Sequence, residues 1–152
     1  DSGYLSLNAP TRSGYRFVGW TGSNGTDPEV VVEINTSDGG ALEFTANWRI
    51  TSYRISYTLN GGTATNKTSY TVEDQFTLNN PVRTGYTFEG WTGTGLDGVQ
   101  PSVTVLKGST GVKSYTAVWK ETVYEISCFR CVPKALADTN NTTLKLSDNT
   151  IL

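Results

Sequence analysis

The stretch LNNPVRTGYTFEGWTG at residues 78–93 returns almost unchanged as LNAPTRSGYRFVGWTG at residues 7–22. The two copies are 71 positions apart, and the same interval separates Trp48 from Trp119. Of the 53 positions from 4 to 56, 20 hold the residue found 71 positions further on. Self-similarity at a fixed interval is typical of tandem-repeat proteins. The sequence therefore predicts copies of one structural unit.

The copies divide the chain into three parts. Residues 1–49 are interpreted as the C-terminal part of one repeat, residues 50–122 as a complete repeat, and residues 123–152 as a diverged start of a third repeat or a separate tail. Only four residues lie between Trp48 and Tyr53. Because so short a connection restricts rotation of neighbouring units, a semi-rigid array is expected.

Alternating apolar and polar residues predict the strands of the complete repeat. Residues 53–59 alternate with a period of two, as in a strand with one buried face. Asn60-Gly61-Gly62 then predicts a tight hairpin turn, with residues 68–72 as the returning strand and with Tyr70 and Val72 facing inward. Further strands are predicted at 76–78, 86–91, 103–105 and 115–119.

One strand has a break in its alternation. Trp91 is out of phase with Tyr86 and Phe88 unless an extra residue interrupts the strand at Gly90. A β-bulge supplies such a residue. We therefore predict a bulge at Gly90.

The residues predicted to face the core share the inward phase of these strands and are mostly aromatic. They are Phe17, Trp48, Tyr53, Ile55, Phe88, Tyr115 and Trp119. No segment has a convincing amphipathic helical pattern. The fold class is therefore predicted to be mainly β, made of small modules of short antiparallel or mixed strands with little or no helix.

Three motifs in the complete repeat together resemble a known family. They are YRISYTLNGGT at residues 53–63, PVRTGYTFEGW at 81–91 and YTAVW at 115–119. This ordered set resembles the Listeria/Bacteroides repeat, also called the internalin B-repeat. The resemblance implies a β-grasp-like fold, with an α+β form as the alternative. It also implies an extracellular bacterial protein, surface-attached or secreted, with adjacent repeats, a spacer or adhesive role toward a host-surface protein or glycan, and no catalytic residues.

Composition narrows the possible functions. Charged residues make up 17% of the chain and the formal net charge is -2, with no basic cluster, so nucleic acid is not an expected partner. The aliphatic runs are far shorter than the roughly 20 residues of a membrane helix, so no membrane insertion is expected. The chain has no histidine, the commonest metal ligand. No metal, cofactor or catalytic residue is predicted.

Two further motifs have ordinary structural interpretations. Residues 93–98 fit the GxGxxG spacing of a phosphate-binding turn, but a strand rather than a helix is predicted after them, which favours a surface loop. Cys128 and Cys131 are the only cysteines, too few for a zinc site in a chain without histidine. They are predicted to form a local disulfide or to remain two thiols, and an extracellular location favours the disulfide.

The aromatic residues leave one functional alternative open. A flat ring with a polar edge suits stacking on a sugar. The candidates for ligand binding are Trp20, Trp91, Tyr15 and Tyr86. Their alternation favours core packing, and a carbohydrate-binding module that uses exposed Trp and Tyr is the alternative to a spacer.

Overall fold

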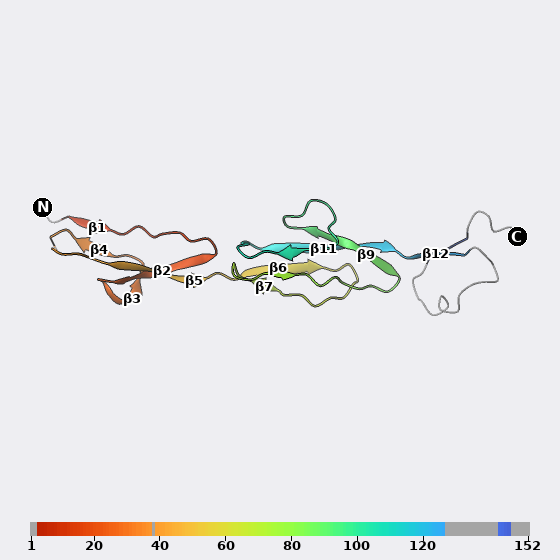
Figure 1. The fold of residues 1–152 in the computed structure, drawn as a ribbon, viewed down its shortest axis with the longest axis horizontal. Coiled ribbons are helices and arrows are strands. Elements are labelled where there is room, and N and C mark those ends of the chain that lie inside the picture. Colours follow the sequence, from red (N-terminus) through yellow and green to blue (C-terminus); the bar gives the residue numbers. More distant parts are fainter. Residues whose placement is uncertain (1–2, 38, 127–142, 147–152) are drawn as a thin grey trace. The chain divides into compact units, whose positions relative to one another are not determined.

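The structure, a computed structural model, describes residues 3–37, 39–126 and 143–146. All regular elements of these residues are β-strands (Figure 1), which confirms the predicted mainly β class. The residue ranges of the first copy are β1 (Tyr4–Ser6), β2 (Tyr15–Gly22), β3 (Gly25–Glu29), β4 (Glu33–Asn35) and β5 (Phe44–Ile50). Those of the second copy are β6 (Tyr53–Thr58), β7 (Ser69–Tyr70), β8 (Phe76–Thr77), β9 (Tyr86–Gly93), β10 (Thr104–Val105) and β11 (Lys113–Glu121).

The remaining strands, β12 (Val123–Ile126) and β13 (Thr143–Leu146), pair in parallel. β12 contains the third copy of the Tyr-x-Ile motif, at Tyr124 and Ile126. The predictions for Cys128 and Cys131 lie outside the described residues.

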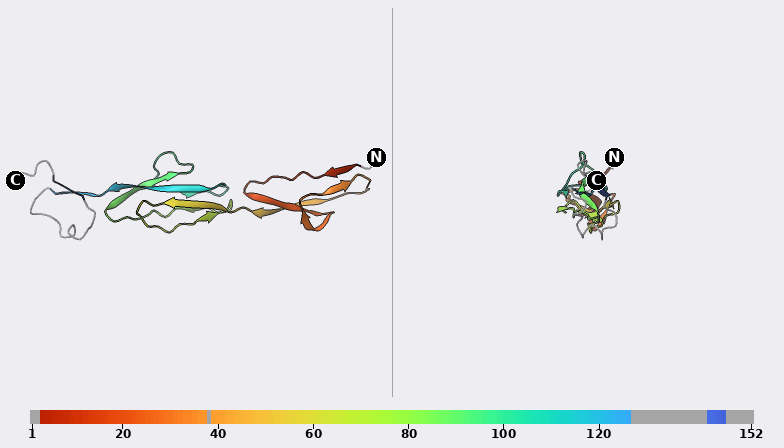
Figure 2. Two further views of the ribbon diagram at one scale, coloured as in Figure 1. Left: turned by 180° about the vertical axis from the view of Figure 1, so that it is seen from behind. Right: turned by 90° about the vertical axis from the view of Figure 1, so that its right-hand side faces the viewer.

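The second copy is built around a mixed four-stranded sheet in the order β7-β6-β11-β9. β11 runs parallel to β6, with Tyr115 opposite Tyr57, and antiparallel to β9. In Figure 2 the yellow β6 and the cyan β11 again lie side by side. A separate antiparallel pair, β8 and β10, completes the copy. β11 is therefore a central strand with partners on both edges.

The first copy repeats part of this arrangement. β5 pairs antiparallel with β2 as β11 pairs with β9, and β1 pairs with β4 as β8 pairs with β10. The sheet order is β3-β2-β5. β5 therefore lies at an edge, whereas β11 lies in the interior of its sheet.

The predicted bulge at Gly90 is confirmed. Val118 of β11 pairs with Gly90, but the next residue, Trp119, pairs with Phe88, so Glu89 is the extra residue of β9. β2 has the same irregularity at the corresponding place. Since an added residue shifts the alternation by one, the tryptophan after the bulge joins the inward face.

The turn at residues 60–62 is present, but it does not form the tight hairpin predicted from it. Asn60 has φ 49° and Gly61 φ 88°, and the Gly62 N–H donates to the Leu59 carbonyl at 3.0 Å. Thr63 then bridges to Val82 instead of pairing with β6. The strand that joins β6 on its outer edge, β7, begins only at Ser69. The turn residues fix the local bend but not the partner of the strand that follows.

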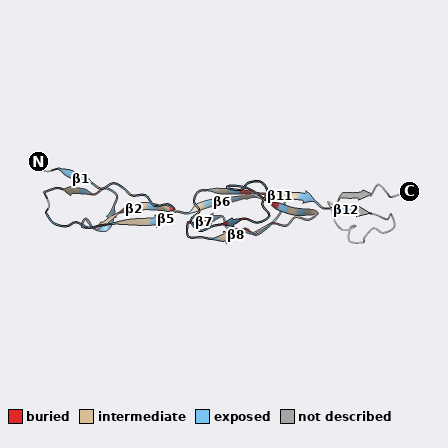
Figure 3. Cartoon of the chain, turned by 45° about the horizontal axis from the view of Figure 1, so that its top comes forward, coloured by how far each residue is buried: buried red, intermediate tan, exposed pale blue. Residues whose placement is uncertain are grey.

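The core of the second copy is formed by residues from most of its strands (Figure 3). The buried apolar side chains between residues 53 and 121 are Ile55, Tyr70, Val72, Leu78, Trp91, Val103, Val105, Tyr115 and Ala117. The inward orientation predicted for Tyr70 and Val72 is confirmed, with exposed fractions of 1% and 8%. In the described part of the first copy, Val32 is the buried apolar side chain. The first copy therefore has the more open interior.

Candidate functional site

A set of three aromatic rings occurs in both copies and is the most conspicuous shared feature of their interiors. In the second copy, Phe88 packs edge-to-face against Trp91 and Trp119, with ring centroids 5.4 Å and 5.5 Å apart. The matching rings of the first copy, Phe17, Trp20 and Trp48, lie 5.3 Å and 5.7 Å apart with similar angles between planes. Aromatic pairs prefer this geometry. The rings therefore stabilise the interior of each copy.

The residues predicted for the core have different degrees of burial. Ile55 and Tyr115 are buried, at 2% and 3% exposure. The others are partly buried and each has an aromatic neighbour: Phe17, Trp48, Tyr53, Phe88 and Trp119.

The four candidate ligand-binding residues differ in how far their rings are open to solvent. Trp91 is fully buried, with 0% exposure, so it presents no ring face to a sugar. Trp20 is partly buried. Tyr86 and Tyr15 each have one ring face covered by an arginine, with guanidinium carbons 3.5 Å and 3.9 Å from the ring centroids. Stacking of a sugar on the Trp91 ring would require the interior of the second copy to open.

The two equivalent tryptophans differ in their hydrogen bonding. The Trp91 indole N–H donates to the Asn80 side-chain oxygen at 3.2 Å. The Trp20 indole nitrogen is buried and has no partner among the described residues. The residue of the first copy that corresponds to Asn80 is Ala9. A buried donor without an acceptor is destabilising.

We therefore expect Ala9→Asn to stabilise the first copy by about 1 kcal/mol, because its amide oxygen supplies the missing acceptor. The measurement is the free energy of unfolding in urea. Asn80→Ala in the second copy is the matched control and should lower that free energy by about the same amount. A destabilising Ala9→Asn would show that the two sites are not equivalent.

Tyr57 lies against two other aromatic side chains in the sheet of the second copy. Its ring is 6.0 Å from Trp91 and 6.3 Å from Tyr115 between centroids, and its hydroxyl donates to the Lys67 carbonyl at 2.7 Å. Burial, with a smaller contribution from Tyr115, raises the pKa of Tyr57 to about 12. The folded protein therefore holds this proton more tightly than the unfolded chain does.

This pKa shift predicts a loss of stability in alkali. The contribution of neutral Tyr57 is complete below the unfolded pKa of about 10 and is lost as the pH rises toward the folded value of about 12. Unfolding free energies measured across that range should fall less steeply for Tyr57→Phe than for the wild type. Parallel slopes for the two proteins would contradict the assignment.

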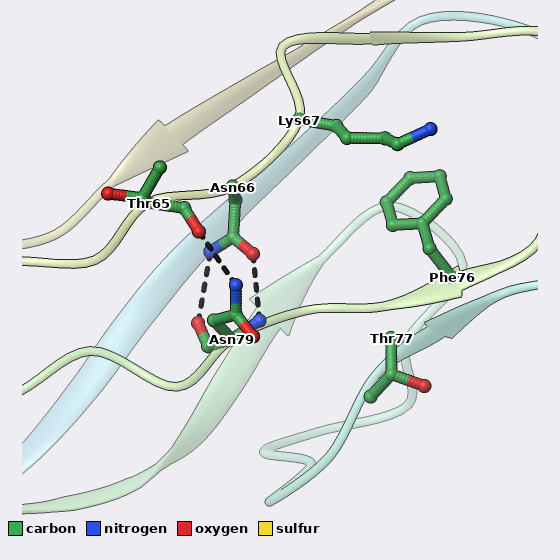
Figure 4. Close-up of a pocket in the computed structure, with 6 residues that line it drawn as sticks. All are labelled: Thr65, Asn66, Lys67, Phe76, Thr77 and Asn79. Carbon is green, nitrogen blue, oxygen red and sulfur yellow. Dashed lines mark hydrogen bonds between the residues drawn. The ribbon is translucent and has the colours of Figure 1, made fainter.

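An open hollow of about 420 Å³ lies beside β8 and was not anticipated from the sequence (Figure 4). Its lining residues are Thr65, Asn66, Lys67, Phe76, Thr77 and Asn79. The Lys67 ammonium lies 5.3 Å from the centroid of the Phe76 ring. Asn66 and Asn79 are joined by hydrogen bonds between side-chain and main-chain atoms.

The polar groups of this hollow are used mainly to hold its own walls together. The Asn66 oxygen accepts from the Asn79 N–H at 2.7 Å, and the Asn66 amide donates to the Asn79 carbonyl at 2.9 Å. The Asn79 amide donates to the Thr65 carbonyl at 2.8 Å. These hydrogen bonds hold the two walls of the hollow together, and no pattern in the sequence marks the hollow as a binding site.

The loop with GxGxxG spacing is a turn between strands. The Leu96 N–H donates to the Gly93 carbonyl at 3.1 Å, and the chain returns to bridge Trp91 with Gln100. No helix begins there, so the prediction of a loop is confirmed. Among the residues that the structure describes, no group of three or more potential ligands is placed to hold a metal ion. In the same residues no helix has the length and apolar character needed to cross a membrane.

Comparison with protein families agrees with the internal duplication. Residues 53–117 match the Listeria-Bacteroides repeat domain, and residues 3–51 match the Divergent InlB B-repeat domain. The second copy is therefore a Listeria-Bacteroides repeat, and the first is a divergent InlB B-repeat. The resemblance inferred from the three sequence motifs is therefore confirmed.

The two copies match different family models. The second copy matches the main family description, whereas the first matches the divergent one. No curated protein and no solved structure shows a significant match to the chain.

Proposed function

We propose that this chain is a non-enzymatic segment of an extracellular bacterial protein, in which tandem repeats act as a semi-rigid spacer between a cell-surface anchor and a functional domain. The observation that carries the proposal is the repetition of the three-ring set with nearly the same geometry in both copies. What the copies share is interior packing.

The polar surface differs between the copies, which also supports a structural role. Glu89, the extra residue of the bulge, corresponds to Val18, and Asp97 of the loop corresponds to Thr26. A site with one chemistry in each repeat requires the same polar groups in each. Repeats that serve as spacers need only the same core.

A replacement experiment tests the spacer role. The chain is placed between a surface anchor and an epitope on a bacterial cell, and antibody access to the epitope is measured. Deleting the chain should reduce access, and an unrelated folded repeat of equal length should restore it. Failure of the unrelated repeat to restore access would contradict a spacer role.

A binding measurement separates the spacer from the carbohydrate-binding alternative. The full chain is applied to glycan and host-protein arrays, with Trp20→Ala as the control because Trp20 is partly exposed. The spacer proposal expects no retained ligand. A ligand bound by the wild type and lost in a folded Trp20→Ala variant would favour the binding module instead.

A further inference from the structure

One charged residue is the same in both copies. Between positions 4 and 56, Arg12 is the only charged residue that recurs unchanged 71 positions further on, where it is Arg83. The acidic residues of the two copies do not correspond, and every other basic residue is replaced by a different one. A site with one chemistry in each repeat requires the same polar group in each. This arginine meets that requirement.

The two arginines have the same contact with a tyrosine. The guanidinium carbon of Arg83 lies 3.5 Å from the ring centroid of Tyr86, and that of Arg12 lies 3.9 Å from the centroid of Tyr15. In each copy the tyrosine N–H donates to the arginine carbonyl, at 3.2 Å and 3.0 Å. The turn therefore brings a guanidinium onto a ring in both copies, where the two groups attract each other.

Stacking on a ring leaves the hydrogen-bonding capacity of the arginine unused. A guanidinium carries five N–H donors in a fixed planar arrangement. Across residues 3–37, 39–126 and 143–146, neither Arg83 nor Arg12 uses these donors in a hydrogen bond or an ion pair. Arg83 is nevertheless partly buried. The ring thus orients a guanidinium whose donors are available to a ligand.

A hollow of about 350 Å³ lies beside Arg83. Its other lining residues are Gly61, Thr63, Val82 and Thr84. Sites for small molecules begin at about 300 Å³. A Cβ added at Gly61 would lie 3.1 Å from Nε of Arg83, which is closer than ordinary van der Waals contact. The absence of a side chain at Gly61 therefore leaves room for the guanidinium at the edge of the hollow.

We propose that Arg83 binds the carboxylate of a uronic acid unit in an acidic polysaccharide. The planar fork of a guanidinium matches the two oxygens of a carboxylate. Val82 is 70% exposed and offers an apolar surface to the C–H groups of the sugar ring. Thr63 and Thr84 are exposed and offer hydroxyl groups to those of the sugar. Tyr86 supports the arginine and is not itself the stacking surface.

This site is independent of the spacer role. One ion pair at a partly exposed position contributes little affinity, so binding is weak and is measured at equilibrium and not by retention on an array. Arg83→Gln should remove the sugar binding and leave epitope access on the bacterial cell unchanged. The spacer role and the sugar site can therefore fail separately.

The first test is a titration of the full 152-residue chain with glucuronate at constant ionic strength, followed by nuclear magnetic resonance. We expect saturable shifts of the Arg83 Nε–H signal and of the amides at 61–63 and 82–84. Glucose has the same ring without the carboxylate and should cause none of these shifts. Absence of saturable shifts with glucuronate, or equal shifts with glucose, would overturn the proposal.

Three arginine variants show whether the contact is local. Arg83→Gln removes the charge and should weaken glucuronate binding at least about tenfold. Arg83→Lys keeps the charge but has no planar fork, so it should also bind more weakly. Arg12→Gln removes the same charge from the other copy and is the matched control, which should leave the affinity unchanged. A dispersed amide spectrum confirms that each variant is folded. Equal weakening by Arg12→Gln and Arg83→Gln would contradict the site.

A second ligand distinguishes a saccharide from an acidic side chain. Acetyl-aspartate amide carries a carboxylate but no sugar hydroxyl groups. Thr84→Val removes an exposed hydroxyl with little change of shape, and it should weaken glucuronate binding about twofold to tenfold while leaving acetyl-aspartate amide unaffected. If acetyl-aspartate amide bound as tightly as glucuronate, and Thr84→Val affected neither, the ligand would be an acidic peptide and the assignment of a uronic acid would be wrong.

Discussion

Replacing Trp91 by alanine is expected to lower the free energy of unfolding of the second copy by about 3–5 kcal/mol. Trp91 is 0% exposed and packs against Phe88 and Tyr57, with centroids 5.4 Å and 6.0 Å away. Its removal leaves a cavity that neighbouring side chains cannot fill without breaking the ring contacts. Urea unfolding of the full chain, followed by far-ultraviolet circular dichroism, measures the loss.

The equivalent substitution in the first copy is the matched control. Trp20 is only partly buried and already lacks a partner for its indole N–H. Trp20→Ala should therefore cost clearly less than Trp91→Ala. A loss below about 1 kcal/mol for Trp91→Ala would show that this ring does not support the core.

The contrast between these tryptophans does not follow from the local sequence pattern around them. Both follow the same Phe-x-Gly pattern, so the bulge that turns one ring inward turns the other inward as well. The two tryptophans differ in the strand that covers them. In the second copy this strand is β6, whose Tyr57 ring packs 6.0 Å from the Trp91 ring. Burial of a ring depends on a strand that is distant in sequence, and local alternation carries no information about it.

Within the second copy, local patterns predicted the strands well but not their pairing. Alternation placed Ile55, Tyr70 and Tyr115 on inward faces, and all three are buried. The parallel pairing of β6 with β11 joins residues far apart in the chain. Register in such a pair is set by which apolar faces meet, so it follows from the assembled core and not from the turn after β6.

The sequence identified aromatic candidates for the site but did not determine which way each ring points. The break in alternation at Gly90 left the direction of the Trp91 ring open, and the bulge turns that ring inward. The hollow beside β8 had no such signal, because its walls are held by side-chain to main-chain bonds of Asn66 and Asn79. Pairings of this kind have no fixed spacing in a sequence.

The bulge itself gives the second large prediction. Gly90→Ala should destabilise the second copy by about 3 kcal/mol or more. Gly90 has φ 150°, which an L side chain rarely adopts, and an added Cβ would lie 2.5 Å from the Gln100 carbonyl oxygen. Backbone strain and overpacking each cost about 1–3 kcal/mol. The measurement is again the free energy of unfolding in urea.

Steric contact at Gly90 cannot be relieved by moving a side chain, because the obstructing atom belongs to the main chain. The Gln100 carbonyl accepts from the Trp91 N–H at 2.7 Å, so shifting it breaks the bridge beside the most buried ring. Gly98→Ala is the matched control, since Gly98 also has a positive φ of 67° but open space around its Cβ. It should lose only the conformational cost of about 1–2 kcal/mol. If the two substitutions destabilised the protein equally, the close approach at the bulge would not contribute, and the inward turn of Trp91 would need another cause.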